Sequence, residues 1–162
     1  MSRMAAEPAI GALLDRLAIS DTLYRYGSSI DRRDSAGLRA VLAEDVRAQY
    51  GNRDPIVGAD ALVQWIDEST KSCLWQHHLL SVYHVDVDGD EARALVYHTS
   101  HRVLEDDPTA AHVLVGRYHD VLRRGADGWQ IGALLLEILW AERRTDPTGY
   151  LDAVGGRGPE VV

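Results

Sequence analysis

Residues 76–104 read QHHLLSVYHVDVDGDEARALVYHTSHRVL, two stretches of alternating apolar and polar side chains joined by one tight turn. Alternation with a period of two is typical of strands, and the DGD sequence at 88–90 is typical of a hairpin connection. Two more stretches of the same kind follow, and each is bounded by turn-forming residues. The predicted strands cover residues 76–87, 91–104, 111–124 and 129–142.

Upstream of these strands the chain has the spacing of helices. Seven residues recur at intervals of three, four or seven: Ile10, Leu13, Leu14, Leu17, Asp21, Tyr24 and Asp31. This spacing predicts a long helix over residues 8–31 that places Asp31 at its end and on its inward face. Asp34 is expected to cap a second, short helix and Asp60 a third, with a short strand over 46–51 between them.

This order of elements predicts one α+β domain. Helices come first and antiparallel strands follow, so the helices are expected to pack on one face of the sheet. Strands of this length must twist and curve, and the concave side of a curved sheet beneath helices leaves room for a pocket. The domain is predicted over residues 1–144. Residues 145–162, which are rich in Gly and Pro, are predicted to form a flexible C-terminal tail.

The composition excludes several kinds of protein. The chain has 162 residues and one cysteine, Cys73, which excludes an internal disulfide framework and a cysteine-rich zinc site. Its net charge is −8 and its basic residues are scattered, which disfavours nucleic acid as a partner. The sequence contains neither a membrane-spanning apolar run nor a signal peptide. We therefore expect a cytoplasmic protein that has no membrane partner.

No motif for a metal or a cofactor is found in the sequence. The seven histidines include no pair two residues apart and no HExxH motif, so a metal site is not predicted. The glycine-rich motifs of nucleotide sites and the GxSxG motif of hydrolases are missing as well. We expect no metal and no cofactor. The chemistry that remains is general acid–base catalysis by His and Asp, with Tyr hydroxyl groups as hydrogen-bond donors.

Asp31 and one of two adjacent histidines are the candidate catalytic residues. The helix dipole opposes a carboxylate in the last turn by about 0.3–1 kcal/mol, and an inward carboxylate is costly unless it is paired. Asp31 could equally be a surface residue that Arg32 and Arg33 neutralise. His77 and His78 point to opposite faces of a strand, and His78 has the phase of the apolar residues that follow it. A single histidine is more often structural than catalytic.

Three stretches of the sequence resemble the SnoaL-like branch of the nuclear-transport-factor-2-like superfamily. They are TLYRYGSSIDRRDSAGLRAVLAEDV at 22–46, HHLLSVYHVDVDGDEARALVYHTSHR at 77–102 and GRYHDVLRRGADGWQI at 116–131. The resemblance extends from residue 8 to about residue 143. It implies a cone-shaped α+β barrel and a homodimer that forms through the sheet. It does not imply one substrate, because this fold supports many reactions.

The resemblance also implies roles for individual residues. Lyases of this branch include scytalone dehydratase, bile-acid 7α-dehydratase and hexachlorocyclohexane dehydrochlorinase. They place an Asp at the end of the first helix against a His at the start of the first long strand. Asp31 matches this Asp, and His78 matches this His. Tyr26 matches an aromatic position that lines the pocket, and Tyr50 matches a pocket tyrosine of scytalone dehydratase.

The match departs from scytalone dehydratase in two places. That enzyme has a second histidine on the next strand, and His98 and His101 both lie near its position without aligning to it. Its Ser and Asn on the third long strand correspond to Gly116 and Tyr118 here. Substrate contacts are therefore expected from His98, His101 and Tyr118. A water-binding arrangement identical to that of scytalone dehydratase is not expected.

The function that the resemblance implies is a cofactor-independent lyase reaction of the dehydratase type. The expected partner is a hydrophobic, cyclic small molecule. Asp31 and His78 would be the catalytic acid–base pair, and Tyr26 and Tyr50 would donate hydrogen bonds to the carbonyl or leaving group. Two alternatives stay open. One is a polyketide cyclase or ketosteroid-type isomerase in the same cavity, with Asp31 as the working base. The other is a small-molecule-binding protein without catalysis.

Overall fold

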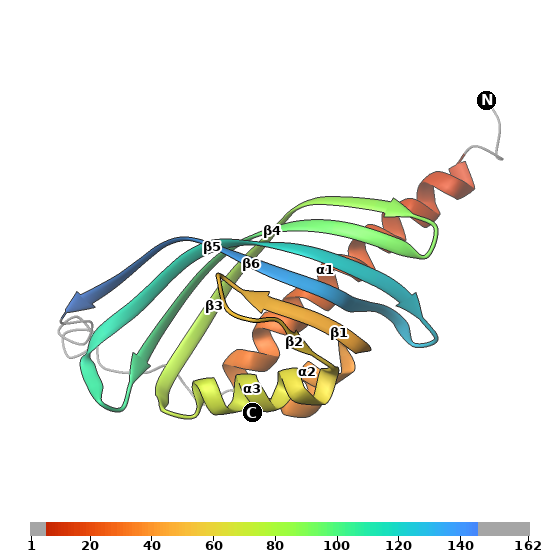
Figure 1. Cartoon of the computed structure of the whole chain (residues 1–162). Coiled ribbons are helices and arrows are strands. Elements are labelled where there is room, and N and C mark those ends of the chain that lie inside the picture. The colour runs from red at the N-terminus through yellow and green to blue at the C-terminus, as the bar shows by residue number, and fades with distance from the viewer. Residues whose placement is uncertain (1–5, 146–162) are drawn as a thin grey trace.

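The computed structural model describes residues 6–145, in which a curved sheet arches over three helices (Figure 1). The elements are α1 (Ala6–Arg32), α2 (Ser35–Ala40), β1 (Leu42–Tyr50), β2 (Ile56–Val57), α3 (Ala59–Thr70), β3 (Cys73–Asp88), β4 (Glu91–Leu104), β5 (Asp107–Gly125) and β6 (Gly128–Thr145). The helices precede the four long strands, and the α+β prediction is confirmed. Residues 146–162, almost all of the predicted tail, lie outside the described residues.

The six strands of the described region form one open sheet in the order β2-β1-β6-β5-β4-β3. The four long strands pair antiparallel with their neighbours in the chain, as predicted. The sheet as a whole is mixed rather than antiparallel, because β1 lies parallel to β6. The pattern of β1 could not reveal this pairing, since its partner is the last strand of the chain. Register shifts between the long strands bend them and help to curve the sheet.

The long helix α1 turns a different face toward the core from the face that its spacing predicts. Leu17 and Tyr24 are 60% and 46% exposed, because they lie on the opposite side of the helix from the residues that the sheet covers. The first turns of α1 also extend beyond the sheet (Figure 1). The residues buried beneath the sheet are Ile19, Leu23, Tyr26 and Ile30. Asp31 lies at the flank of this buried face, next to the start of β3. None of the helices within residues 6–145 is long and apolar enough to cross a membrane.

The shorter elements differ from the prediction at their ends. Asp34 caps α2 as predicted, since its carboxylate accepts a hydrogen bond from a backbone N–H of the first turn at 2.8 Å. The prediction that Asp60 caps α3 is wrong: the cap is Gly58, whose φ of 97° suits glycine. The strand predicted over 46–51 begins earlier, at Leu42, because Leu42 already pairs with β6. The two-residue strand β2 is not evident in the sequence.

The hydrophobic core forms where the helices pack against the concave side of the sheet. Its largest fully buried side chains include Ile19, Leu38, Leu42, Leu62, Leu122 and Ile131. The core does not fill the whole concave side, and the space that remains between the long strands and α3 is a cavity.

Candidate active site

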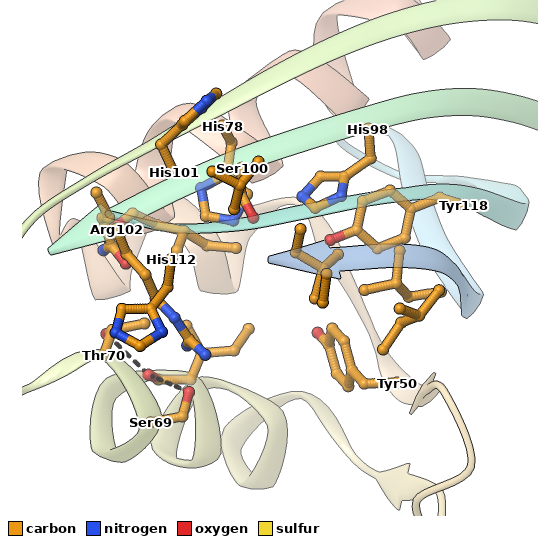
Figure 2. A pocket seen from close by; sticks show the side chains of 18 of the residues that line it. Tyr50, Ser69, Thr70, His78, His98, Ser100, His101, Arg102, His112 and Tyr118 are labelled. Carbon is orange, nitrogen blue, oxygen red and sulfur yellow. Dashed lines mark hydrogen bonds between the residues drawn. The ribbon is translucent and has the colours of Figure 1, made fainter. Parts of the chain in front are cut away.

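The cavity has a volume of about 690 Å³ and lies between the concave face of the sheet and α3 (Figure 2). The helices and β1 supply one part of its wall: Tyr26, Ile30, Tyr50, Trp65, Ile66, Ser69 and Thr70. The long strands supply most of the rest. This volume suits a small organic ligand.

Strands β3–β6 line the cavity with transverse rows of side chains that the strand register aligns. One row, which we call the imidazole row, consists of His78, Ser100, Leu114 and Ala141. The next row, which we call the basic row, consists of Gln76, Arg102, His112 and Arg143. Every residue of both rows lines the cavity. On each strand the residue of one row lies two positions along the chain from the residue of the other row, so the rows lie about 7 Å apart.

His78 and Asp31 form a hydrogen-bonded pair at the side of the cavity. Nδ1 of His78 lies 2.6 Å from Oδ1 of Asp31, and the backbone N–H of His78 donates to Oδ2 at 2.8 Å. The side chains of His78 and Asp31 are 15% and 19% exposed. A carboxylate can only accept hydrogen bonds, so we assign the ring proton to Nδ1, which leaves Nε2 with a free lone pair. His78 lines the cavity, and Asp31 lies behind it.

Contacts between the end of α1 and the start of β3 hold this pair in place. The side-chain amide of Gln76 donates a hydrogen bond to the Ile30 carbonyl at 2.6 Å, and the Arg33 guanidinium donates one to the Cys73 carbonyl. Gly27 lets the helix approach the strand closely, because a Cβ there would come within 2.8 Å of a leucine side chain of β3. The carboxylate and the imidazole are therefore fixed by two elements that are far apart in the sequence.

His98 faces the same cavity in a different environment. It is 3% exposed, and neither of its ring nitrogens has a hydrogen-bond partner within the described residues. Its ring centroid lies 5.4 Å from that of His78 and 5.0 Å from that of Tyr118. Burial, and to a smaller extent the nearby His78, lowers the pKa of His98 to about 4. This imidazole is therefore neutral near pH 7.

Three tyrosines line the cavity on the side of His98. The hydroxyl oxygens of Tyr26 and Tyr50 are 2.5 Å apart and share a hydrogen bond. The rings of Tyr26 and Tyr118 meet edge to face at 6.0 Å, and Tyr50 stacks on Trp65 at 4.6 Å. Burial raises the pKa of all three phenols. They therefore stay protonated and can donate hydrogen bonds.

Asp120 is a buried carboxyl group that the sequence pattern did not single out. It is 3% exposed, and its Oδ1 has no hydrogen-bond partner among residues 6–145. Burial raises the pKa of Asp120 well above its usual value. Asp120 has the same strand phase as Tyr118 and Leu122, which are buried on β5. This phase is the signal that could have identified it.

The predicted substrate-binding residues are not all placed alike. Four of them line the cavity: Tyr26, Tyr50, His98 and Tyr118. His101 flanks the cavity, but Figure 2 shows its ring pointing away from the rings of His78 and His98. In the described part of the chain, no three His, Cys, Asp or Glu side chains gather in a way that could hold a metal ion.

The comparisons with known proteins agree with this architecture. A family model described as a SnoaL-like domain matches residues 11–134. The uncharacterised protein Rv2910c of Mycobacterium tuberculosis (strain ATCC 25618 / H37Rv) is 29% identical over 124 residues, which are 76% of this chain and 84% of that protein. Two solved structures cover most of both chains. The structure of a hexachlorocyclohexane dehydrochlorinase (LinA) type 2 has a TM-score of 0.78 to this structure at 13% sequence identity. The alignment covers 95% of this chain and 99% of that chain.

An NTF2-like protein with a cystatin-like fold from Novosphingobium aromaticivorans has a TM-score of 0.74 at 21% identity. The alignment covers 96% of this chain and 98% of that chain. At these identities the two structures support the fold alone.

Proposed function

Because the chain belongs to the SnoaL-like family and has its NTF2-like, cone-shaped α+β fold, we propose that it is a cofactor-independent lyase of the dehydratase type. Its substrate is a hydrophobic, cyclic small molecule with a hydroxyl group β to a carbonyl group. The observation that carries this proposal is the 2.6 Å contact between His78 and Asp31 beside a cavity of about 690 Å³. The dehydrochlorinase with the same fold is named for an elimination reaction, which supports this class.

His78 acts as the general base in this proposal. Its Nε2 takes a proton from the carbon between the carbonyl and hydroxyl carbons, and the electrons of that C–H bond form a C=C bond as the C–O bond breaks. The leaving oxygen takes a proton back from the imidazolium and departs as water. Asp31 holds Nδ1 and stabilises the imidazolium between these two transfers. A positioned base of this kind contributes roughly 10²–10⁴-fold to the rate.

The neutral groups of the cavity stabilise the charge that develops on the substrate. One hydroxyl group of the Tyr26–Tyr50 pair donates to the other, which leaves one O–H for the carbonyl oxygen of the substrate. His98 has one N–H donor in either neutral tautomer, and no group of the described residues accepts from it. It can therefore donate a hydrogen bond to the substrate without exchanging a proton.

The two alternatives have less support. A cyclase or isomerase with Asp31 as the working base requires this carboxylate to contact the substrate. Asp31 instead lies behind His78 and is not among the residues that line the cavity. A protein that only binds its ligand would not need an imidazole that a carboxylate holds through both Nδ1 and the backbone.

Dehydration of bicyclic β-hydroxy ketones tests the proposal. One such compound, 3-hydroxy-1-tetralone, gives 1-naphthol when it loses water, and the product can be followed by its fluorescence. We expect the wild type to form this product and His78→Ala to be no faster than the uncatalysed reaction. His84→Ala changes an exposed histidine of the same strand and should keep full activity. Equal rates for the wild type and His78→Ala would contradict the proposal, and isomerised ketone without loss of water would favour the isomerase.

We also propose that two copies pair through the outer face of the sheet. Large apolar side chains that are at least 40% exposed gather there: Leu79, Tyr83, Tyr97, Leu135 and Leu139. An exposed apolar patch of this kind is typical of an interface. Light scattering should give the mass of a dimer for the wild type and of a monomer for Tyr97→Glu. A monomeric wild type would contradict the pairing.

A further inference from the structure

Arg102, His112 and Arg143 of the basic row have no part in the dehydratase mechanism, although they line the cavity. Arg53, from the loop after β1, lines the cavity as well. Figure 2 shows Arg102 and His112 at the end of the cavity next to the last turn of α3, whereas Tyr50 and Tyr118 lie toward the other end. One end of the cavity is therefore basic and the other carries the phenols.

Two of the basic groups are neutralised within the protein. Asp107 accepts two hydrogen bonds of 2.6 Å from Arg143, and its Oδ2 lies 3.0 Å from Nε2 of His112. Glu142, which also lines the cavity, is paired with Arg144. Each carboxylate at this end of the cavity thus already has an arginine partner.

Arg102 and Arg53 differ from these groups. In the part of the chain that the structure describes, neither guanidinium has a carboxylate within 4.0 Å. The chain as a whole carries a net charge of −8, so acidic partners are abundant elsewhere on the molecule. Both residues are exposed. Arg102 lines the cavity at its basic end without such a partner and is suited to an anion from outside the protein, because a guanidinium binds carboxylate and phosphate oxygens through two parallel hydrogen bonds.

We propose that the substrate carries an anionic oxygen group, a carboxylate or a phosphate, which Arg102 binds while its ring lies against His78. This inference rests on the proposed function, since it names the class of that substrate. The imidazole row and the basic row lie about 7 Å apart. The anionic group of the substrate is therefore separated from its reacting carbon by about the width of a ring and a short chain. Ser69 and Thr70 at this end donate their hydroxyl hydrogens to the Ile66 carbonyl, which leaves Arg102 as the main donor there.

Binding of three matched probes tests this inference without turnover. The probes are 3-(2-naphthyl)propanoate, 2-(2-naphthyl)ethyl phosphate and the uncharged 3-(2-naphthyl)propanamide, and titration calorimetry gives their Kd values at low ionic strength. We expect at least one anion to bind the wild type tenfold or more tightly than the amide. The anion that binds more tightly identifies the group on the substrate. Arg102→Gln should reduce the preference to threefold or less.

Arg93→Gln is the matched control, because Arg93 is an exposed arginine of the same strand that does not line the cavity. This variant has the same net charge as Arg102→Gln and should keep the full preference for the anion. Equal affinities of the wild type for both anions and the amide would overturn the inference, as would an equal loss in Arg93→Gln. A preference for the anion in a protein that never dehydrates a ketone would uphold this inference and remove only the lyase proposal.

Discussion

Two imidazoles face one cavity with their ring centroids 5.4 Å apart, and their surroundings differ. His78 is partly exposed, and Asp31 binds both its Nδ1 and its backbone N–H. His98 is buried, neither of its ring nitrogens has a partner within the described residues, and its pKa falls to about 4. A general base must hold the proton that it takes, and a carboxylate partner stabilises the cation. The partner, more than the residue type, therefore decides which histidine suits catalysis.

The two carboxyl groups nearby differ in the same way. Asp31 accepts two hydrogen bonds from His78 and lies next to the cavity wall. Asp120 is buried without a partner for Oδ1 among residues 6–145, and burial raises its pKa. We call the hydrogen-bonded pair of Asp31 and His78 the charged side, and the two separately buried groups, Asp120 and His98, the neutral side. Variants of each side test whether this difference is real.

The largest effect is expected from Asp31→Asn, which removes the charge of the charged side and keeps its shape. Asparagine can still accept a hydrogen bond from His78, but it stabilises the imidazolium far less than a carboxylate does. We expect kcat for dehydration to fall by about 10²–10⁴-fold with little change in KM. His98→Gln should reduce kcat by less than about tenfold. A loss in His98→Gln as large as that in Asp31→Asn would contradict the distinction between the two histidines.

The next effect concerns stability in acid, and it belongs to the neutral side. Because the pKa of His98 is about 4 in the folded protein and near 6.5 in the unfolded chain, the unfolded chain takes up a proton first as the pH falls. The wild type should therefore lose about 3 kcal/mol of unfolding free energy through this residue between about pH 6.5 and 4. His98→Leu should lack this loss in urea unfolding at the two pH values. His84→Gln, at an exposed histidine, should keep it. Parallel curves for the wild type and His98→Leu would show that burial does not hold His98 neutral.

An effect of opposite sign is expected at Asp120. Burial raises the pKa of this carboxyl group in the folded protein, so the unfolded chain loses its proton first as the pH rises. This residue therefore makes the wild type less stable as the pH rises above about 4. Asp120→Asn cannot ionise, and its unfolding free energy relative to the wild type should increase from about pH 4 to pH 8. A constant difference across this range would indicate that Asp120 is ionised in the fold.

Strand phase made much of the cavity wall predictable. Alternation alone places His78 on the same face as the apolar residues that follow it, and it places His98 and His101 on opposite faces, as observed. Phase failed on α1, where Leu17 and Tyr24 are exposed because the opposite side of the helix packs against the sheet. Apolar residues occur on both sides of α1, so their spacing alone does not show which side the sheet covers.

Contacts between distant elements were not predictable from pattern. Asp31 and His78 are 47 positions apart on a helix and a strand, and only the family resemblance brought them together before the structure did. To predict the basic row, one must know how β3, β4, β5 and β6 pair with one another, and register shifts change this pairing along the strands. No single strand contains that information. Asp120 was within reach of the phase argument, since Tyr118 is two residues before it on the same buried face.

The tautomer of His78 tests the central claim most directly, because it requires no substrate. Two-bond ¹H–¹⁵N correlation spectra near pH 8 distinguish a protonated ring nitrogen from an unprotonated one. We predict that Nδ1 of His78 is protonated and Nε2 is not, and that Asp31→Asn shifts the population toward the Nε2–H form. A wild-type His78 with its proton on Nε2, or spectra that Asp31→Asn leaves unchanged, would contradict the account.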